Sequence, residues 1–573
     1  MLPVLSFILS RIKPETQQLK TPFEDGLTDT PWQEYPRPQF KRDSYLCLNG
    51  KWDLSVKSGK KTENLGKILV PFVPESRISG INRHFKKNDI LIYKKTFTLP
   101  DGFKKERVIL HFGAADQETV VFVNGQSVGS NIGGYIPFSF DITEYLTGGE
   151  NELSVHIADP LCTDLPYGKQ RKKRGGMWYT PISGIWQTVW LESVCNSYIK
   201  DIKITPTLSD VTIEVSGGND TKQIVFEGKT HEFTGSSYTL TVENPINWTP
   251  ENPYLYNFTL ISGQDKVDSY FALRTVEIKG TKILLNGKPY FFHGLLDQGY
   301  FSDGIFLPAT EKGFLFDIET MKDLGFNTLR KHIKIEPDLF YYYCDKQGMI
   351  VFQDIINSGK YSFLIDTALP TIGLKKGIVH SANARRREQF EKCAKDTVNL
   401  LYNHPCICYY TLFNEGWGQY DTDRIYEEMK ELDSTRVWDA ASGWFETEKN
   451  DVISEHIYFK PVKTKTDGKR PAVLSEFGGY SYKITDHSFN RDKTYGYKFF
   501  TEAEKFMAET EKLYNNEIIS AIKNGLCGAI LTQVSDVEDE TNGLVTYDRQ
   551  VIKVDTDRMQ KISQNLFSAF DEL

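Results

Sequence analysis

The chain has 573 residues, more than one hydrophobic core usually holds, so several domains are expected. With 40% hydrophobic and 25% charged residues, the composition is that of a folded soluble protein and excludes a disordered one. The formal net charge of −8 gives no reason to expect a nucleic-acid partner, and the basic run KQRKKRGG (169–176) is interpreted as a solvated loop.

Cysteine usage and the start of the chain bear on the compartment. The eight cysteines are scattered and form no CxxC pair, which indicates reduced thiols rather than a disulfide framework or a zinc site. The opening MLPVLSFILSRIKPE lacks the basic region and cleavage site of a signal peptide and is interpreted as packing or tail. No stretch approaches the ~20 apolar residues of a membrane span. We therefore expect a cytoplasmic protein with no membrane partner.

The first part of the chain reads as all-β. Short strand-like runs are separated by Gly, Asn and Asp turns, and VNGQ (123–126) is a two-residue hairpin signal. A second set of such runs follows from about 198 to 278. This spacing predicts two sandwiches in series, one over 1–195 and one over 196–278.

Strands and helices alternate after residue 278. Eight strand candidates occur in this part, which is the number that a (β/α)₈ barrel requires. We therefore predict a barrel over 279–573. The eight candidate strands are 290–296, 327–332, 349–354, the run ending at 415, 437–442, 451–458, 472–479 and 528–536.

Polar residues stand at the ends of these otherwise apolar strands. In a (β/α)₈ barrel the active site lies at the carboxyl ends of the strands, so such residues are expected to converge in one pocket. A single polar residue at a strand end usually has a structural role, but polar residues at the same position of several strands are harder to explain that way. The predicted set is His293, Arg330, His332, Asp354, Asn414, Glu415, His456, Tyr458 and Glu476.

Two carboxylates in this set suggest a reaction. Glu415 on the fourth strand and Glu476 on the seventh would face each other, and a facing carboxylate pair is the minimum requirement for cleaving a glycosidic bond. An apolar wall such as Trp417 would keep Glu415 protonated, while Arg330 or Tyr458 would keep Glu476 charged. The alternative is a structural acid at each strand end, paired with Arg330 or Lys331.

Several motifs, in this order, resemble glycoside hydrolase family 2, which contains β-galactosidases, β-glucuronidases and β-mannosidases. The resemblance covers nearly the whole chain and implies a jelly-roll domain, an immunoglobulin-like domain and a catalytic barrel. The motifs are LNGKWDL (48–54), VNGQSVG, WYTPISGIWQTVWLE (178–192), WTPENPYLY (248–256), LLNGKPYFFHG (284–294), LFNEGWG and LSEFGG.

The resemblance also implies roles for individual residues. Glu415 would be the general acid/base and Glu476 the nucleophile of a retaining double displacement. Asn414 would bind the sugar 2-hydroxyl, and Tyr458, Arg330 and Asp354 match family positions. The candidate sugar-binding residues are Asn414, Tyr458, Arg330, His332, Asp297, Gln298, Asp354, His456, Trp417 and Trp444.

Departures from the family pattern concern the substrate. The segment RKHIKIEP differs from the family pattern after the second strand, so His332 is only an approximate counterpart of the family residue there. The segment LLDQGYFSDG also differs from the family pattern, so Asp297 and Gln298 are candidate sugar contacts with no matching family residue. Leu531 aligns where a stacking Trp often stands. Leu544 replaces the Lys of the Asn-x-Lys motif typical of glucuronidases, which disfavours a uronide unless a lysine of the 331–334 loop replaces it.

The preferred function is an exo-β-glycosidase of the β-galactosidase type. The alternatives are a uronidase of the same family and a carbohydrate-binding protein that has lost turnover. No cofactor and no metal site is predicted, since HExxH is absent, although a structural cation is left open. The expected partner is a carbohydrate, a homo-oligomer is left open, and the long 355–382 loop is assigned either to the pocket rim or to ordinary packing.

Overall fold

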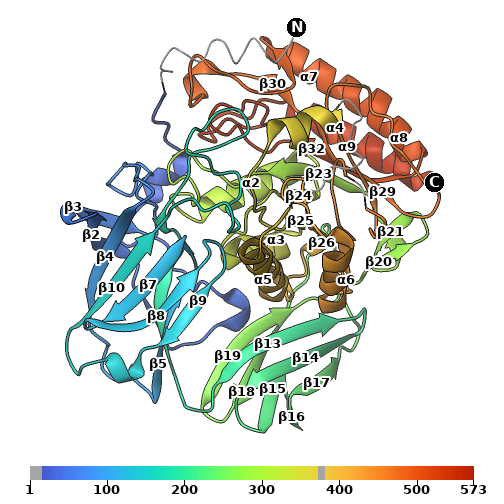
Figure 1. The fold of residues 1–573 in the computed structure, drawn as a ribbon. Helices are drawn as coiled ribbons and strands as arrows, with labels where there is room; N and C mark the ends of the chain where they lie inside the picture. The colour runs from blue at the N-terminus through green and yellow to red at the C-terminus, as the bar shows by residue number, and fades with distance from the viewer. Residues whose placement is uncertain (1–15, 372–380, 446) are drawn as a thin grey trace.

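The computed structural model describes residues 16–371, 381–445 and 447–573, and it divides into two β-domains and a barrel (Figure 1). The predicted tail at 1–15 and the 372–380 part of the long loop lie outside these ranges. The predicted architecture of two sandwiches followed by a (β/α)₈ barrel is confirmed. Among the described residues, we find no helix long and apolar enough to cross a bilayer.

The N-terminal domain is a sandwich of a four-stranded sheet (order β1-β12-β5-β9) and a six-stranded sheet (order β3-β2-β4-β10-β7-β8), with the small pair β11-β6. In β2, inward side chains such as Trp52 and Leu54 alternate with more exposed ones, and they belong to the core of this domain. The strands are β1 (Tyr45–Cys47), β2 (Gly50–Ser58), β3 (Lys61–Val70), β4 (Asp89–Phe97), β5 (Arg107–Phe112), β6 (Ala115–Asp116), β7 (Glu118–Val123), β8 (Gln126–Ile132), β9 (Phe138–Asp141), β10 (Asn151–Ala158), β11 (Gly184–Ile185) and β12 (Val189–Val194).

The predicted hairpin at VNGQ joins β7 to β8. Asn124 (φ 49°) and Gly125 (φ 78°) both have the left-handed backbone that a two-residue turn of this kind requires.

The second domain packs a three-stranded sheet (β13-β14-β17) on a four-stranded one (β16-β15-β18-β19), around a separate core. Its strands are β13 (Ile199–Pro206), β14 (Asp210–Gly217), β15 (Thr221–Phe226), β16 (Lys229–Thr234), β17 (Ser237–Thr241), β18 (Tyr256–Ser262) and β19 (Asp265–Phe271). A small sheet, β20 (Val276–Lys279), β21 (Lys282–Leu285) and β22 (Lys288–Pro289), leads into the barrel.

All eight predicted barrel strands are present in one parallel sheet, whose order β27-β26-β25-β24-β23-β32-β29-β28 makes a nearly closed barrel. The strands are β23 (Phe292–Asp297), β24 (Thr328–Lys331), β25 (Ile350–Asp354), β26 (Ile407–Thr411), β27 (Val437–Asp439), β28 (Ile453–Ile457), β29 (Ala472–Gly478) and β32 (Leu526–Thr532). The helices around them include α2 (Lys312–Asp323), α3 (Asp338–Gln347), α5 (Ala384–Leu401), α6 (Thr422–Leu432), α7 (Ala503–Lys512), α8 (Ile519–Lys523) and α9 (Thr556–Asp571).

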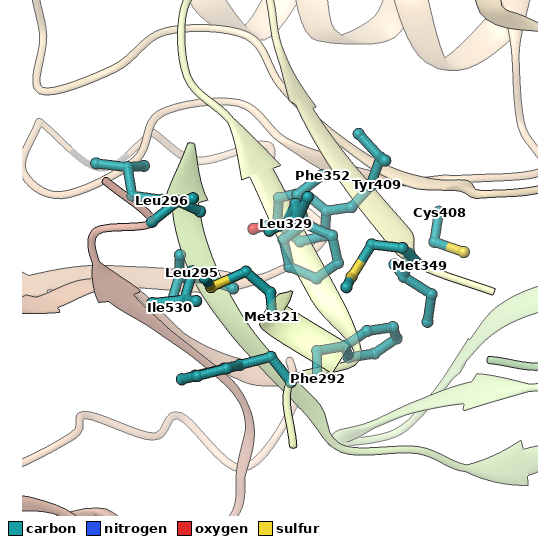
Figure 2. Packing of buried hydrophobic residues seen from close by; sticks show 14 of the residues in the cluster. Phe292, Leu295, Leu296, Met321, Leu329, Met349, Phe352, Cys408, Tyr409 and Ile530 are labelled. Atoms are coloured by element: carbon teal, nitrogen blue, oxygen red, sulfur yellow. The ribbon is translucent and has the colours of Figure 1, made fainter. Parts of the chain in front are cut away.

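Bulky side chains fill the barrel, as Figure 2 shows for residues of neighbouring strands. The Phe352 and Tyr409 rings stack with centroids 4.2 Å apart, and Phe292 lies 5.2 Å from Phe352. The strands are buried on both faces, which explains their continuous apolar runs.

A loop of the N-terminal domain covers the carboxyl ends of the barrel strands. The amide of Tyr167 donates to the Asn357 carbonyl (3.1 Å), and its hydroxyl donates to the Gly359 carbonyl (2.9 Å). On the other side of the mouth, the amide of Thr180 donates to Glu538 (2.9 Å). The first domain therefore forms part of the barrel mouth.

Candidate active site

The two predicted catalytic carboxylates meet at the barrel mouth. Glu415 follows β26 and Glu476 belongs to β29, and an oxygen of each lies within 4.8 Å of the other and of a His456 nitrogen. Both side chains are largely withdrawn from solvent, with exposed fractions of 15% for Glu415 and 5% for Glu476. This is the facing pair that the strand ends predicted.

The backbone turns sharply at Glu415. Glu415 has φ 53° and Gly416 has φ 71°, and left-handed backbone is rare for a residue other than glycine. A Cβ on Gly416 would lie 2.0 Å from Cδ2 of Phe445, so a larger residue does not fit there. The glycine after the acid thus allows the strand to end with Glu415 turned toward the pocket.

Arg330 at the end of β24 connects three other predicted residues. Its Nε donates to Asp354 (2.9 Å), its Nη1 to Glu476 (3.1 Å), and its Nη2 to Asn414 (2.9 Å). The side chain is fully buried, and burial alone would lower the pKa of the guanidinium, but the facing Asp354 and Glu476 raise it. Such a buried charge is tolerated because it is paired and hydrogen-bonded.

These contacts set the orientation of Asn414. Its Oδ1 accepts hydrogen bonds from Arg330 Nη2 and from the Ser442 hydroxyl (3.0 Å). Because Oδ1 faces these two donors, the NH₂ end of the amide is the end that remains for a ligand.

Glu476 is held by a second donor besides Arg330. The Tyr458 hydroxyl donates to Oε2 of Glu476 (2.5 Å) and accepts from the Thr532 hydroxyl (3.0 Å). The Tyr458 ring stacks on Tyr497 with centroids 3.8 Å apart. The carboxylate is therefore fixed by the predicted Arg330 and Tyr458 together.

His456 connects the two carboxylates. Burial lowers its pKa to about 3, so the ring is neutral. Arg330 Nη1 lies 3.3 Å from Nε2 and can only donate, which places the ring proton on Nδ1, 2.8 Å from Oε1 of Glu415. Burial also raises the pKa of Glu415, against the opposing charges of Lys169, His332 and Arg330.

His332 and Asp354 form a further buried pair. Nδ1 of His332 lies 2.7 Å from Oδ2 of Asp354. Burial alone would raise the pKa of Asp354, but Arg330 and His332 hold it below the ordinary value. Burial and the charge of Lys169 lower the pKa of His332. His332 thus lies in the site, although its sequence context only approximately matched the family.

The two predicted tryptophans lie in the loops after β26 and β27. The indole N–H of Trp417 donates to the Gly359 carbonyl (2.8 Å), and its ring packs edge-on against Trp178 (5.1 Å). Trp444 lies 5.8 Å from the His456 ring, and its N–H donates to the Asp366 carbonyl (2.9 Å). Trp444 therefore lies beside the histidine that contacts Glu415, whereas Trp417 belongs to the apolar cluster between the first domain and the barrel loops.

Asp297 and Gln298 differ in what they leave free. Both oxygens of Asp297 are engaged, one with Lys331 (2.5 Å) and one with the Gly299 amide (2.8 Å). The Gln298 amide donates to Gln533 (2.8 Å), while its own Oε1 is buried with no partner among the described residues. Gln298 therefore retains an acceptor for a ligand.

His293 is the one strand residue of the predicted set that lies elsewhere. Its Nδ1 lies 3.2 Å from the Gly325 carbonyl and its Nε2 lies 3.3 Å from the Tyr514 hydroxyl, on the helical layer around the barrel. It is the second residue of β23, so it lies near the amino end of that strand rather than at its mouth. Its convergence with the site was a wrong prediction.

The substrate-related departures have structural explanations. Thr532, not Leu531, contacts Tyr458, whereas Leu531 packs under Gly478, where an added Cβ would lie 2.5 Å from its Cδ1. Leu544 is a buried core residue. Lys331 and Lys334 are both paired with Glu336, so neither is a free cation for a ligand.

Sequence reasoning missed the contribution of the first domain. Within the basic run 169–176, residues 171–173 are exposed as predicted, but Lys169 and Gln170 are buried at the mouth, beside Trp178 and Tyr179. The Tyr179 hydroxyl donates to Glu540, which lies in a loop after β32. The aromatic segment WYTP directly after the basic run could have indicated this packing, because a fully solvated loop does not need buried aromatic residues.

Three family models match the chain in order: "Glycosyl hydrolases family 2, sugar binding domain" over 79–193, "Glycosyl hydrolases family 2" over 197–274, and "Glycosyl hydrolases family 2, TIM barrel domain" over 276–554. A β-galactosidase of Thermoanaerobacter pseudethanolicus is 26% identical over 74% of this chain and 61% of its own length. A putative β-glucuronidase of Formosa agariphila is 24% identical over 77% of this chain and 42% of its own length. The chain thus spans about half the length of these relatives.

Solved structures share the whole fold. A family 2 β-galacturonidase from Eisenbergiella tayi has a TM-score of 0.70 at 19% identity, covering 92% of this chain and 98% of its own. A β-D-glucuronidase of Dictyoglomus thermophilum has a TM-score of 0.72 at 19% identity, covering 94% and 99%. With three matching domain models in the predicted order, the chain belongs to glycosyl hydrolases family 2.

Proposed function

We propose that this protein is a retaining exo-β-glycosidase that removes a terminal sugar by double displacement, with Glu415 as acid/base and Glu476 as nucleophile. The observation that carries the proposal is the approach of the two carboxylates, whose oxygens come within 4.8 Å of each other. Retaining enzymes hold their two carboxyl groups about 5–5.5 Å apart, whereas inverting enzymes need about 6.5–9.5 Å to admit a water.

In the first step Glu476 attacks the anomeric carbon while Glu415 gives its proton to the leaving oxygen. The raised pKa of the buried Glu415 supports the acid role, since the group keeps its proton closer to neutral pH. The ion pair with Arg330 and the hydrogen bond from Tyr458 hold Glu476 in place for attack. In the second step Glu415 takes a proton from water, which attacks the glycosyl–Glu476 ester and releases the β-anomer.

Asn414 acts on the sugar rather than on the reacting bond. Its NH₂ group, oriented by Arg330 and Ser442, donates to the 2-hydroxyl of the bound sugar. This contact strengthens as positive charge develops at the neighbouring anomeric carbon, so it lowers the transition state more than the ground state.

The enclosed mouth supports exo action. Glu476 is 5% exposed, and the first-domain loop that carries Tyr167 and Thr180 is fastened to the barrel loops on two sides. Such enclosure favours the end of a sugar chain over its interior as the substrate.

Two sugar classes compete. β-Galactosides, the class favoured from the sequence, accord with relatives named β-galactosidase, and β-uronides accord with relatives named β-glucuronidase. The sequence argument against a uronide rested on the missing lysine at Leu544. A specific observation favours the uronide, namely a buried cation at the mouth that comes from the first domain.

The test uses azide as a substitute nucleophile. On a dinitrophenyl β-glycoside, Glu415→Ala still forms the ester, and azide enters from the vacant acid/base side to give the β-glycosyl azide. In Glu476→Ala azide replaces the nucleophile and gives the α-glycosyl azide. NMR of the products assigns each role, and exchanged anomers would reverse the assignment. Glu75→Gln, a buried carboxyl change in the first domain, is the matched control and retains wild-type turnover.

A further inference from the structure

Lys169 is a largely buried lysine whose ammonium has no hydrogen bond or ion pair among the residues that the structure describes. Lys169 is 9% exposed, and its ammonium lies 5.9 Å from the centroid of the Trp178 ring. By contrast, the other two buried lysines of this region are neutralised, Lys331 by Asp297 and Glu336 and Lys334 by Glu336. The Lys169 ammonium is therefore available to an anion that is not part of the described chain.

The loop that carries Lys169 is fixed against the sugar pocket. The Lys169 carbonyl accepts from the Tyr179 amide (3.0 Å). Its neighbour Gly168 lies so close to the barrel that an added Cβ would be 3.0 Å from the carbonyl of Ile333, the residue after His332. The position of Lys169 is thus set by contacts on both sides.

The charge of Lys169 reaches groups around the pocket. It opposes the burial that raises the pKa of Glu415 and of Glu540, and it adds to the burial that lowers the pKa of His332. These three residues lie in three different barrel loops. The charge of Glu476 in turn raises the pKa of Glu540. A cation that influences both the acid and the opposite wall lies within the enclosed mouth.

Glu540, an acid on that wall, already has hydrogen-bond partners. Glu540 accepts from the Tyr179 hydroxyl on one oxygen and from Asn542 (3.1 Å) on the other. Burial raises its pKa, which favours its neutral form. A chain of hydrogen bonds continues from there: Asn542 accepts from Gln533 (2.8 Å), and Gln533 accepts from Gln298 (2.8 Å). Oε1 of Gln298 is buried and has no hydrogen-bond partner among the described residues. The pocket wall thus offers hydroxyl-binding groups and one free cation, Lys169, among the described residues.

We propose that Lys169 is the specificity-determining residue of this site and binds an anionic substituent on the terminal sugar, a uronic acid carboxylate or a sulfate ester. The inference rests on the proposed glycosidase function and assigns its substrate class. A CH₂OH group cannot compensate the ammonium, whereas an anion forms a charge-assisted hydrogen bond with it. The required lysine comes from the first domain and not from position 544 or the 331–334 loop.

The test compares matched substrates that differ only in charge. The 4-nitrophenyl β-glucuronide is paired with the β-glucoside, and the β-galacturonide with the β-galactoside and its 6-sulfate. We expect wild type to prefer an anionic member, and Lys169→Met to lower kcat/KM on it by about 10- to 100-fold while changing the neutral member less than about 3-fold. Lys169→Arg should retain part of the preference. Lys172→Met, at an exposed position in the same basic run, is the matched control and should leave kcat/KM unchanged on both the anionic and the neutral member.

The same panel distinguishes a uronic acid carboxylate from a sulfate ester. A preference for the 6-sulfate over the uronides would assign a sulfated sugar as the substrate. Equal losses on the charged and neutral members of a pair, or wild-type preference for a neutral sugar, would overturn the proposal and leave Lys169 a structural role.

A binding measurement separates this inference from the proposed function. Titration calorimetry with D-glucuronate, D-galacturonate and galactose 6-sulfate, against D-glucose and D-galactose, needs no turnover. If no glycoside is cleaved but an anionic sugar binds wild type and not Lys169→Met, the anion site stands and the glycosidase function fails. If nothing is cleaved and no lysine-dependent binding is seen, both fail.

Discussion

Nδ1 of His456 lies 2.8 Å from Oε1 of Glu415. Since the same nitrogen is 3.4 Å from Oε2 of Glu476, one neutral imidazole holds both carboxylates at a fixed separation. Its position is fixed in turn by Arg330, which donates to the other ring nitrogen.

Replacing His456 by phenylalanine tests this role. The change keeps the ring volume but removes the N–H that fixes Glu415, so we expect kcat to fall about 10- to 100-fold with a smaller change in KM. His293→Phe is the matched control, since His293 is also fully buried in the barrel with a pKa lowered to about 3, but lies away from the mouth. The control is expected to lose stability and to keep kcat. Comparable kcat losses in the two variants would contradict the role of His456.

Asn414→Ala tests the contact with the 2-hydroxyl. The variant loses the amide donor that Arg330 and Ser442 orient, so kcat/KM on the natural glycoside should fall about 10- to 100-fold. On the corresponding 2-deoxy glycoside, which has no hydroxyl to bind, the same substitution should change kcat/KM by less than about 3-fold. Equal losses on both substrates would place the effect of Asn414 in the packing around Arg330 instead.

The sequence predicted the barrel part of the site well for a physical reason. The buried parallel strands are continuous apolar runs, so a polar residue at their carboxyl end stands out, as Arg330, Asp354 and Glu476 do. Strand counting then placed Glu415 and Glu476 in one pocket. His293 failed because a polar residue can interrupt an apolar run at either end, and the pattern alone does not say which end it occupies.

The first-domain contribution was not predictable in this way. Lys169 and Tyr179 reach the pocket through packing between domains, such as Tyr167 on Gly359 and Gly168 on Ile333, and no periodicity within one domain encodes a contact with another. Charge density alone assigned the whole of 169–176 to solvent, which holds for 171–173 only.

Gly416→Ala tests the turn after the acid. Left-handed backbone costs a residue with a Cβ about 1–2 kcal/mol, and here the methyl would also meet the Phe445 ring. We expect kcat to fall about 100-fold because Glu415 is displaced. Gly228→Ala is the matched control: it has φ 74°, and nothing lies within 4 Å of an added Cβ. It should show the backbone cost in thermal unfolding with unchanged kcat, and an equally active Gly416→Ala would show that the turn tolerates a side chain.

His404 links stability to pH outside the active site. Its two ring nitrogens each lie 2.6 Å from a carboxylate, of Asp345 and of Asp338. Burial alone would lower its pKa, but these two acids raise it to about 10, so the folded protein holds the imidazolium. A pKa above that of the unfolded chain, about 6.5, means that this stabilisation is complete below pH 6.5 and is lost as the pH rises toward 10.

The free energy of unfolding should therefore decline over that interval, by up to about 1.4 kcal/mol per pH unit from this group. In His404→Gln the linkage is absent, and the two acids lose their cation, so the variant should be destabilised by about 3–5 kcal/mol at pH 6.5. The measurement is the difference in thermal midpoint between wild type and variant at pH 6.5 and pH 9.5, which cancels other groups that titrate in both proteins. The difference should shrink at the higher pH because wild type has by then lost most of the contribution. A difference that stays constant between the two pH values would mean that His404 is neutral in the folded protein and that its two carboxylates are held by other means.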